Sequence, residues 1–166
     1  MNTLTDMDGM FSDDMTLDDV ADLPSFINSP GGRYICQIPS IKKETYVKDG
    51  SKMDRIRIIY QIVQIEGTVG DEPAPNPGDL ISETFTANGL EYFKRRIKGL
   101  LPTIQGITLG QIFDYLESTY TREACVDILC TSATKDGYTN ISITKITPVE
   151  FVPLPDGVKL FKAKSK

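Results

Sequence analysis

Residues 53–65 have the sequence MDRIRIIYQIVQI, the longest run of alternating side chains in the chain. Alternation with a period of two, rich in β-branched residues, predicts a β-strand, because successive side chains of a strand point to opposite faces. One face of this predicted strand is apolar and consists of Ile56, Ile58, Tyr60 and Ile62. The other face opens with Arg55 and Arg57. We therefore expect a β-rich domain in which this strand buries its apolar side and exposes its basic side.

Two further strands are predicted on either side of this run, at residues 33–41 and 80–86. Residues 42–52 are polar and contain the turn sequence KDGS, so they are predicted to form the loop between the first two strands. Residues 67–79 hold three prolines and three glycines and are predicted to be a second loop.

The second half of the chain changes from a strand pattern to a helix pattern and back. Residues 88–101 and 108–118 repeat apolar side chains at helical spacing, and the sequence TLGQ that opens the second segment is a capping box. Strands are predicted at residues 124–133 and 138–152, joined by a KDG turn. The predicted order is three strands, a helical insertion and two more strands.

Few small folds have this order of elements. It matches the five-stranded OB-fold, a Greek-key barrel, with a helical insertion between strands three and four. A β-rich α+β sheet with a helical pair on one face fits the same order and is the alternative. We predict a mainly β OB-fold domain at residues 24–152, flanked by flexible tails: an acidic arm at residues 1–23 and a Lys-rich segment at residues 153–166.

The composition fits one domain of ordinary size with tails. The 166 residues are 40% hydrophobic and 25% charged, with a formal net charge of −5. This charge is unevenly distributed, because residues 1–32 contain seven Asp and no Lys or Arg, which leaves 18 basic against 16 acidic residues in the remainder. The net acidity therefore does not argue against a nucleic-acid partner.

Histidine is absent from the sequence, which excludes Ser-His-Asp and Cys-His catalysis and His-containing zinc sites. No glycine-rich segment ends in the GK[ST] of a phosphate-binding loop. We predict that the protein is not an enzyme and uses no cofactor or metal. The three cysteines, Cys36, Cys125 and Cys130, lack CxxC spacing and are predicted to be buried, reduced thiols.

Basic and aromatic side chains gather in the part of the predicted barrel where OB-folds hold single strands: strand two and the loops that join strands one to two and four to five. Lys and Arg neutralise phosphates, and Tyr rings stack on bases without sequence preference. Tyr60 is included although it also fits the core, because its face depends on the strand register. The predicted nucleic-acid contacts are Lys42, Lys43, Tyr46, Lys48, Lys52, Arg55, Arg57, Tyr60, Lys135 and Tyr138.

Over about three quarters of its length the chain resembles the OB-fold single-stranded-DNA-binding proteins encoded in phage replication and recombination modules. The similar pieces are GGRY at 31–34, KDG at 48–50, IIYQI at 58–62, the helix with KGL at 98–100, DGY at 136–138, Asn140 and ITP at 146–148. The resemblance implies sequence-tolerant binding of single-stranded DNA and its transfer to replication or recombination enzymes.

No run approaches the ~20 apolar residues of a membrane span and no secretory signal opens the chain, so we expect no membrane partner and a cytoplasmic location, which for a phage-encoded protein is the cytoplasm of the host cell.

Such proteins usually carry their acidic tail at the C-terminus, whereas here the acidic arm is N-terminal. Its carboxylates, interspersed with apolar side chains, predict a contact for replication or recombination proteins; a plain solubilising tail is the alternative. The sequence TLDD at residues 16–19 predicts a short helix there. The predicted partner-binding residues are Asp13, Asp14, Asp18, Asp19 and Phe11. A protein-interaction or structural adaptor that uses this arm is the alternative function.

Overall fold

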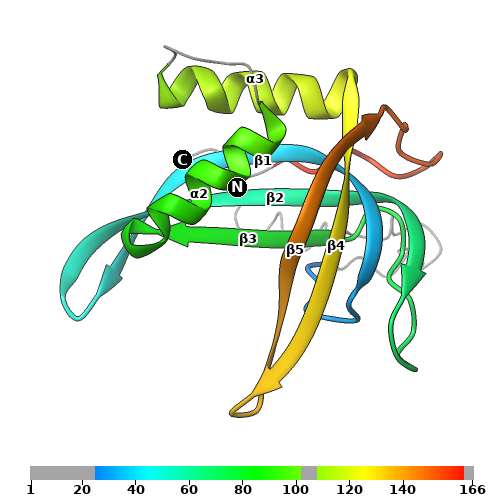
Figure 1. Cartoon of the computed structure of the whole chain (residues 1–166), viewed down its shortest axis with the longest axis horizontal. Coiled ribbons are helices and arrows are strands. Elements are labelled where there is room, and N and C mark those ends of the chain that lie inside the picture. Colours follow the sequence, from blue (N-terminus) through cyan, green and yellow to red (C-terminus); the bar gives the residue numbers. More distant parts are fainter. Residues whose placement is uncertain (1–24, 102–107, 163–166) are drawn as a thin grey trace, which may run out of the picture.

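The computed structural model describes residues 25–101 and 108–162, and the chain is mainly β (Figure 1). Five strands form one antiparallel sheet in the order β3-β2-β1-β4-β5. They are β1 (Gly32–Lys48), β2 (Ser51–Thr68), β3 (Leu80–Thr86), β4 (Ala124–Lys135) and β5 (Tyr138–Glu150). The acidic arm predicted at residues 1–23, with its TLDD sequence, lies outside the described residues.

The alternating run that predicts a strand lies within β2. Ile58, Tyr60 and Ile62 are fully buried in the main core, on the inner face of the sheet. Residues of opposite parity, among them Arg57 and Gln61, lie on the other face, because side chains alternate along a strand. We call the side of β1, β2 and β3 that carries Arg57 and Gln61 the outer face.

The strands β1 and β2 continue well beyond their predicted ends and form a long hairpin. Residues 42–52, predicted as a polar loop, instead extend the ladder until Lys48 pairs with Ser51. The two turn residues, Asp49 and Gly50, both have positive φ, 52° and 78°, as a two-residue type I′ turn requires. The loop prediction is wrong. The end of the hairpin projects into solvent, and a strand that is exposed on both faces has no apolar alternation by which the sequence distinguishes it from a loop.

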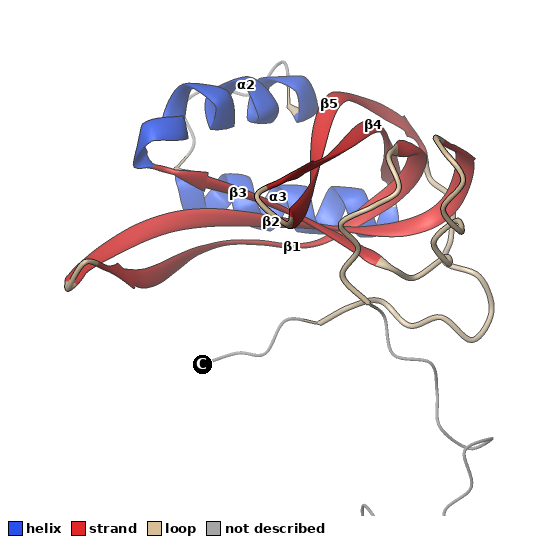
Figure 2. Ribbon diagram, turned by 90° about the horizontal axis from the view of Figure 1, so that it is seen from below, coloured by secondary structure: helices blue, strands red, loops and turns tan. Residues whose placement is uncertain are grey.

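A short 3₁₀ turn and two helices follow β3 and precede β4: η2 (Ala87–Gly89), α2 (Leu90–Leu100) and α3 (Leu109–Arg122). The predicted capping box of α3 is confirmed, since Gln111 N donates to the Thr108 hydroxyl and Thr108 N donates to the Gln111 side chain. Figure 2 shows both helices on one side of the β1–β2 ribbon. Within residues 25–101 and 108–162, no helix combines the length and apolar character needed to cross a membrane.

The sheet is strongly bent and open. Figure 1 shows β4 and β5 crossing the direction of β2 and β3 at a steep angle. The strands β3 and β5 are the two edges and form no ladder with each other. The Arg96 side chain of α2 spans the opening, with Nη2 2.7 Å from Glu83 Oε2 on β3 and 3.2 Å from the Ile143 carbonyl oxygen on β5. Five antiparallel strands with a helical insertion are thus present as predicted, arranged as an open sheet.

The C-terminal residues differ from the prediction of a flexible tail. Residues 153–162 follow β5 back across the outer face, where Leu154 joins a small cluster with Ile35 and Val63. Gln61 on β2 holds this segment through hydrogen bonds to its backbone. These contacts could not be predicted from local composition, because Gln61 and Lys159 are 98 residues apart in the chain.

The three cysteines are buried and free, as predicted. Cys36 and Cys130 lie in the main core, and Cys125 lies in the small outer cluster. Burial raises the pKa of Cys130 to about 12 and the pKa of Cys36 well above its ordinary value, because the thiolate loses its hydration. These thiols are therefore protonated in the folded protein at neutral pH.

Candidate nucleic-acid interface

The far end of the β1–β2 hairpin, which projects from the rest of the sheet in Figure 2, carries basic and aromatic residues on its outer face. Directly opposite residues in an antiparallel ladder share a face. Lys42 lies opposite Arg57, Glu44 lies opposite Arg55, and Tyr46 is the next outer-face residue along β1. We call these residues the hairpin face: Lys42, Glu44, Tyr46, Lys48, Arg55 and Arg57.

One carboxylate faces two guanidinium groups at the centre of the hairpin face. Arg55 Nε donates to Glu44 Oε1 at 3.0 Å, and Arg57 Nε lies 3.4 Å from the same oxygen. The Arg55 guanidinium carbon also lies 5.1 Å from the centroid of the Tyr46 ring, within the range of a cation–π contact. Glu44 thus contacts the Nε edge of each guanidinium group, and a positive excess remains on this surface.

The remaining predicted residues of the hairpin lie on its opposite face. Lys43 and Lys52 occupy alternate positions of the ladder, on the side away from Arg55 and Arg57. Lys43 Nζ lies 3.9 Å from a carboxylate oxygen of Asp54. The structure therefore brings together five of the seven predicted hairpin residues and separates these two lysines from them.

Tyr60 is a correction to the predicted contacts. Its side chain is 0% exposed, and its hydroxyl donates to Glu83 Oε1 at 2.7 Å. Burial raises the pKa of Tyr60 well above its ordinary value. A ring covered on all sides offers no surface for a base to stack on, so Tyr60 belongs to the core. Alternation along β2 accounts for this burial, because Tyr60 points to the same face as Ile58 and Ile62, which are also fully buried.

The second predicted surface lies at the end of the β4–β5 hairpin. Lys135 and Tyr138 lie opposite each other and flank the turn Asp136–Gly137, whose φ angles are 54° and 81°. The Tyr138 ring is 74% exposed. Figure 1 shows this hairpin end standing apart from the end of the β1–β2 hairpin. The predicted residues thus form two separate groups.

Two kinds of residue on the outer face escaped the sequence analysis. Glu44 is one, because its position opposite Arg55 depends on the hairpin register. The others are Thr84 and Thr86 of β3, which lie opposite Arg57 and Arg55 and add hydroxyl groups beside the guanidinium groups. The signal available in the sequence was the alternation of residues 80–86, which places both threonines on one face.

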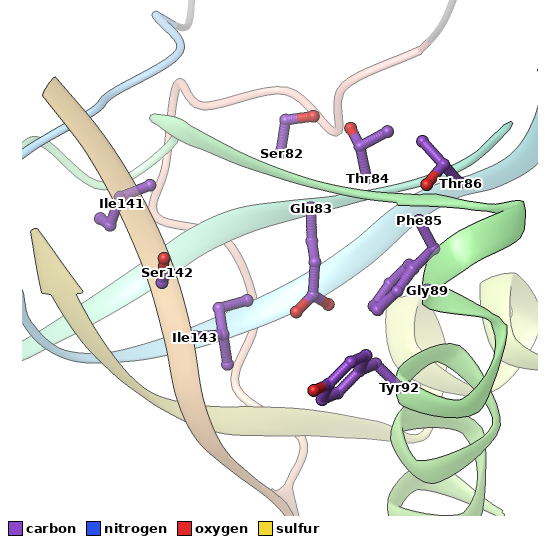
Figure 3. Close-up of a pocket in the computed structure, with 10 residues that line it drawn as sticks. All are labelled: Ser82, Glu83, Thr84, Phe85, Thr86, Gly89, Tyr92, Ile141, Ser142 and Ile143. Carbon is purple, nitrogen blue, oxygen red and sulfur yellow. The ribbon is translucent and has the colours of Figure 1, made fainter. Parts of the chain in front are cut away.

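A cleft of about 370 Å³ lies between the open edges of β3 and β5. Figure 3 shows the Phe85 and Tyr92 rings on one side of it and Ile141 and Ile143 on the other. Glu83 points into the cleft, but its carboxylate accepts hydrogen bonds from Tyr60 and Arg96. The cleft is therefore lined by mixed apolar and hydroxyl groups, and its one carboxylate is already paired.

The predicted partner-binding residues Asp13, Asp14, Asp18, Asp19 and Phe11 lie outside the described residues. Among residues 25–101 and 108–162, no group of three or more His, Cys, Asp and Glu side chains is placed to hold a metal ion.

Comparisons with protein-family models, with curated proteins and with solved structures gave no match. The site therefore has to be interpreted from its own geometry.

Proposed function

We propose that this protein binds single-stranded DNA with little sequence preference and without catalysis. The observation that carries the proposal is the hairpin face, where Tyr46, Arg55 and Arg57 lie on one surface and, among the described residues, Glu44 alone forms ion pairs with the two arginines. Lys and Arg side chains neutralise the phosphates of a single strand, while aromatic rings stack on its bases. Both kinds of group occur here within one short stretch of ladder.

We propose further that the domain is an OB-fold. Support comes from five antiparallel strands, a strongly bent sheet and helices placed after the third strand. An OB-fold is a partly open Greek-key barrel, and here the opening lies between β3 and β5, where Arg96 bridges the two edges. In OB-folds, single strands lie across strands two and three, and the hairpin face includes part of β2 beside Thr84 and Thr86 of β3.

In the proposed binding mode, the basic side chains contact phosphates and the tyrosine rings stack on bases. Arg55, Arg57 and Lys42 contact phosphates, and Tyr46 stacks on a base while its other side supports the Arg55 guanidinium. Lys135 and Tyr138 supply a second contact at the end of the β4–β5 hairpin. The resemblance of the sequence pieces at 31–34, 58–62 and 136–138 to those of phage single-strand-binding proteins extends the proposal to a role in replication or recombination, with partner proteins recruited through the acidic arm.

Fluorescence anisotropy with a labelled dT oligonucleotide of about 16 nucleotides tests this function, because one OB-fold covers ~4–16 nucleotides. We expect binding at low salt that weakens with a slope of about −0.7 in log K against log salt for each neutralised phosphate. Duplex DNA and single-stranded RNA of the same length are the comparison ligands. Failure of the dT oligonucleotide to bind at low salt would contradict the proposal and favour the adaptor alternative.

A further inference from the structure

The C-terminal segment, residues 151–162, is fixed to the outer face by one buried glutamine. The Gln61 side chain is 0% exposed. Its Nε2 donates to the carbonyl oxygens of Gly78 at 3.2 Å and Lys159 at 3.0 Å, and its Oε1 accepts from Phe161 N at 2.8 Å. Both N–H donors of this amide and one of the two lone pairs of its oxygen are therefore used, and two of these three hydrogen bonds hold the C-terminal segment.

Other contacts along the segment show that the outer face fits it. Gln37 Nε2 donates to the Val152 carbonyl oxygen at 3.1 Å. The Phe161 ring packs edge-on against Phe26, with centroids 6.0 Å apart. Gly78 has φ of 101°, and a Cβ there would lie 2.8 Å from Val158 Cγ1, so glycine also makes room for the segment. The segment is thus part of the folded domain.

This attachment adds positive charge to the outer face of the sheet, the same face that carries Arg55 and Arg57. Gln61 shares the outer face of β2 with Arg57 and Arg55, about 13 Å and about 20 Å away along the strand at ~3.3 Å per residue. Lys159 and Lys162 are both exposed. Asp156 is the one acidic residue in residues 151–162, so the segment attracts phosphates and does not imitate them.

We infer that the C-terminal segment is a second part of the single-strand-binding surface, in which Lys159 and Lys162 contact phosphates of the same strand that Arg55 and Arg57 hold. This inference rests on the proposed function. The strand runs along the outer face of β2 from the hairpin end to the segment at Gln61. Figure 2 shows the described part of the loop after β5, drawn in tan, on the side of the sheet opposite α2, which is the outer face.

The test compares two double variants of the full chain that remove equal charge. Lys159→Gln/Lys162→Gln changes the C-terminal segment, and Lys94→Gln/Lys98→Gln changes the exposed surface of α2, on the other side of the sheet. We expect the first variant to reduce the salt slope for the dT oligonucleotide by about 1.4, corresponding to two phosphate contacts at ~0.7 each. The α2 variant should keep the slope of the wild type.

A third variant separates position from charge. Gln61→Leu removes both hydrogen bonds to the segment and keeps every lysine. It should weaken binding and reduce the salt slope as Lys159→Gln/Lys162→Gln does. If Gln61→Leu does not fold, the comparison of the two lysine variants alone decides the test. An unchanged slope in Lys159→Gln/Lys162→Gln, or an equal loss in the α2 variant, would overturn the inference. In that case binding by the wild type would still support the proposed function, whereas a wild type that does not bind contradicts both.

Discussion

Arg55 Nε donates to Glu44 Oε1 at 3.0 Å from directly across the β1–β2 ladder. The same carboxylate oxygen lies 3.4 Å from Arg57 Nε, so the Glu44 carboxylate lies against two guanidinium groups. Because phosphate oxygens bind guanidinium groups in the same way as carboxylate oxygens do, the proposed function implies that Glu44 competes with a DNA phosphate for these two guanidinium groups. Its removal therefore has a predictable effect on binding.

Glu44→Gln should tighten binding of single-stranded DNA. The substitution keeps the shape of the side chain but removes the charge that competes with phosphate. An ion pair of this exposure is worth ~0.2–1 kcal/mol, so the dissociation constant should fall by a factor between about 1.4 and about 5. Anisotropy titrations at one fixed low salt concentration measure the change. Weaker binding by Glu44→Gln would show that Glu44 orients the arginines and does not compete with the ligand.

Tyr138→Ala should weaken binding without changing its salt dependence. The ring is the most exposed aromatic side chain among those described, and stacking on one base contributes ~1–3 kcal/mol. Stacking releases no counterions, so the slope of log K against log salt should stay the same. Tyr138→Phe is the matched control and should bind like the wild type. Equal affinity of the Ala and Phe variants would remove the β4–β5 hairpin from the interface.

Arg96→Met should destabilise the fold. The Arg96 and Glu83 side chains are only 16% and 15% exposed, and the loss of Arg96 leaves a buried carboxylate without its countercharge and breaks the bridge to Ile143. Removal of one partner of a buried ion pair costs about 3 kcal/mol. Urea unfolding measures the loss, and Arg95→Met, next in the chain but exposed, should change stability by less than about 0.5 kcal/mol. A loss no larger in Arg96→Met than in Arg95→Met would contradict the bridging role.

The buried thiols predict how stability depends on pH. The pKa of Cys130 rises from an ordinary 9.0 to about 12 on folding because burial penalises the thiolate. Between these two values the folded state holds a proton that the unfolded chain has released, so the free energy of unfolding should be constant from pH 7 to 8 and should fall as the pH rises above about 9. Urea unfolding at each pH measures this. The fall should be less steep in Cys130→Ala, and identical pH profiles would contradict the assignment.

Local alternation in the sequence was enough to predict the core side of β2, and the absence of CxxC spacing predicted that the cysteines are buried, free thiols. The sequence also predicted the capping box at Thr108 and Gln111, because that motif needs only four consecutive residues. The length of the β1–β2 hairpin could not be predicted this way. Its end is exposed on both sides, so no apolar periodicity distinguishes strand from loop over residues 42–52.

The candidate site was predictable to the extent that it depends on alternation within one strand. Arg55 and Arg57 share a face for that reason, whereas the separation of Lys43 and Lys52 from them depends on the ladder register. Tyr60 was predicted as a contact although the alternation places it with Ile58 and Ile62, and all three side chains are fully buried. The attachment of the C-terminal segment to Gln61 depends on contacts between positions about 100 residues apart, which no local pattern records.

The salt dependence of single-strand binding in an Arg55→Gln/Arg57→Gln variant tests the central claim most directly. The titration uses the labelled dT oligonucleotide, with Lys94→Gln/Lys98→Gln as the variant of equal charge change on α2. We expect the arginine variant to lose affinity for every sequence alike and to reduce the slope of log K against log salt by about 1.4, while the α2 variant keeps the affinity and slope of the wild type. Equal affinities and slopes in the two variants would contradict the assignment of the hairpin face as the DNA-binding surface.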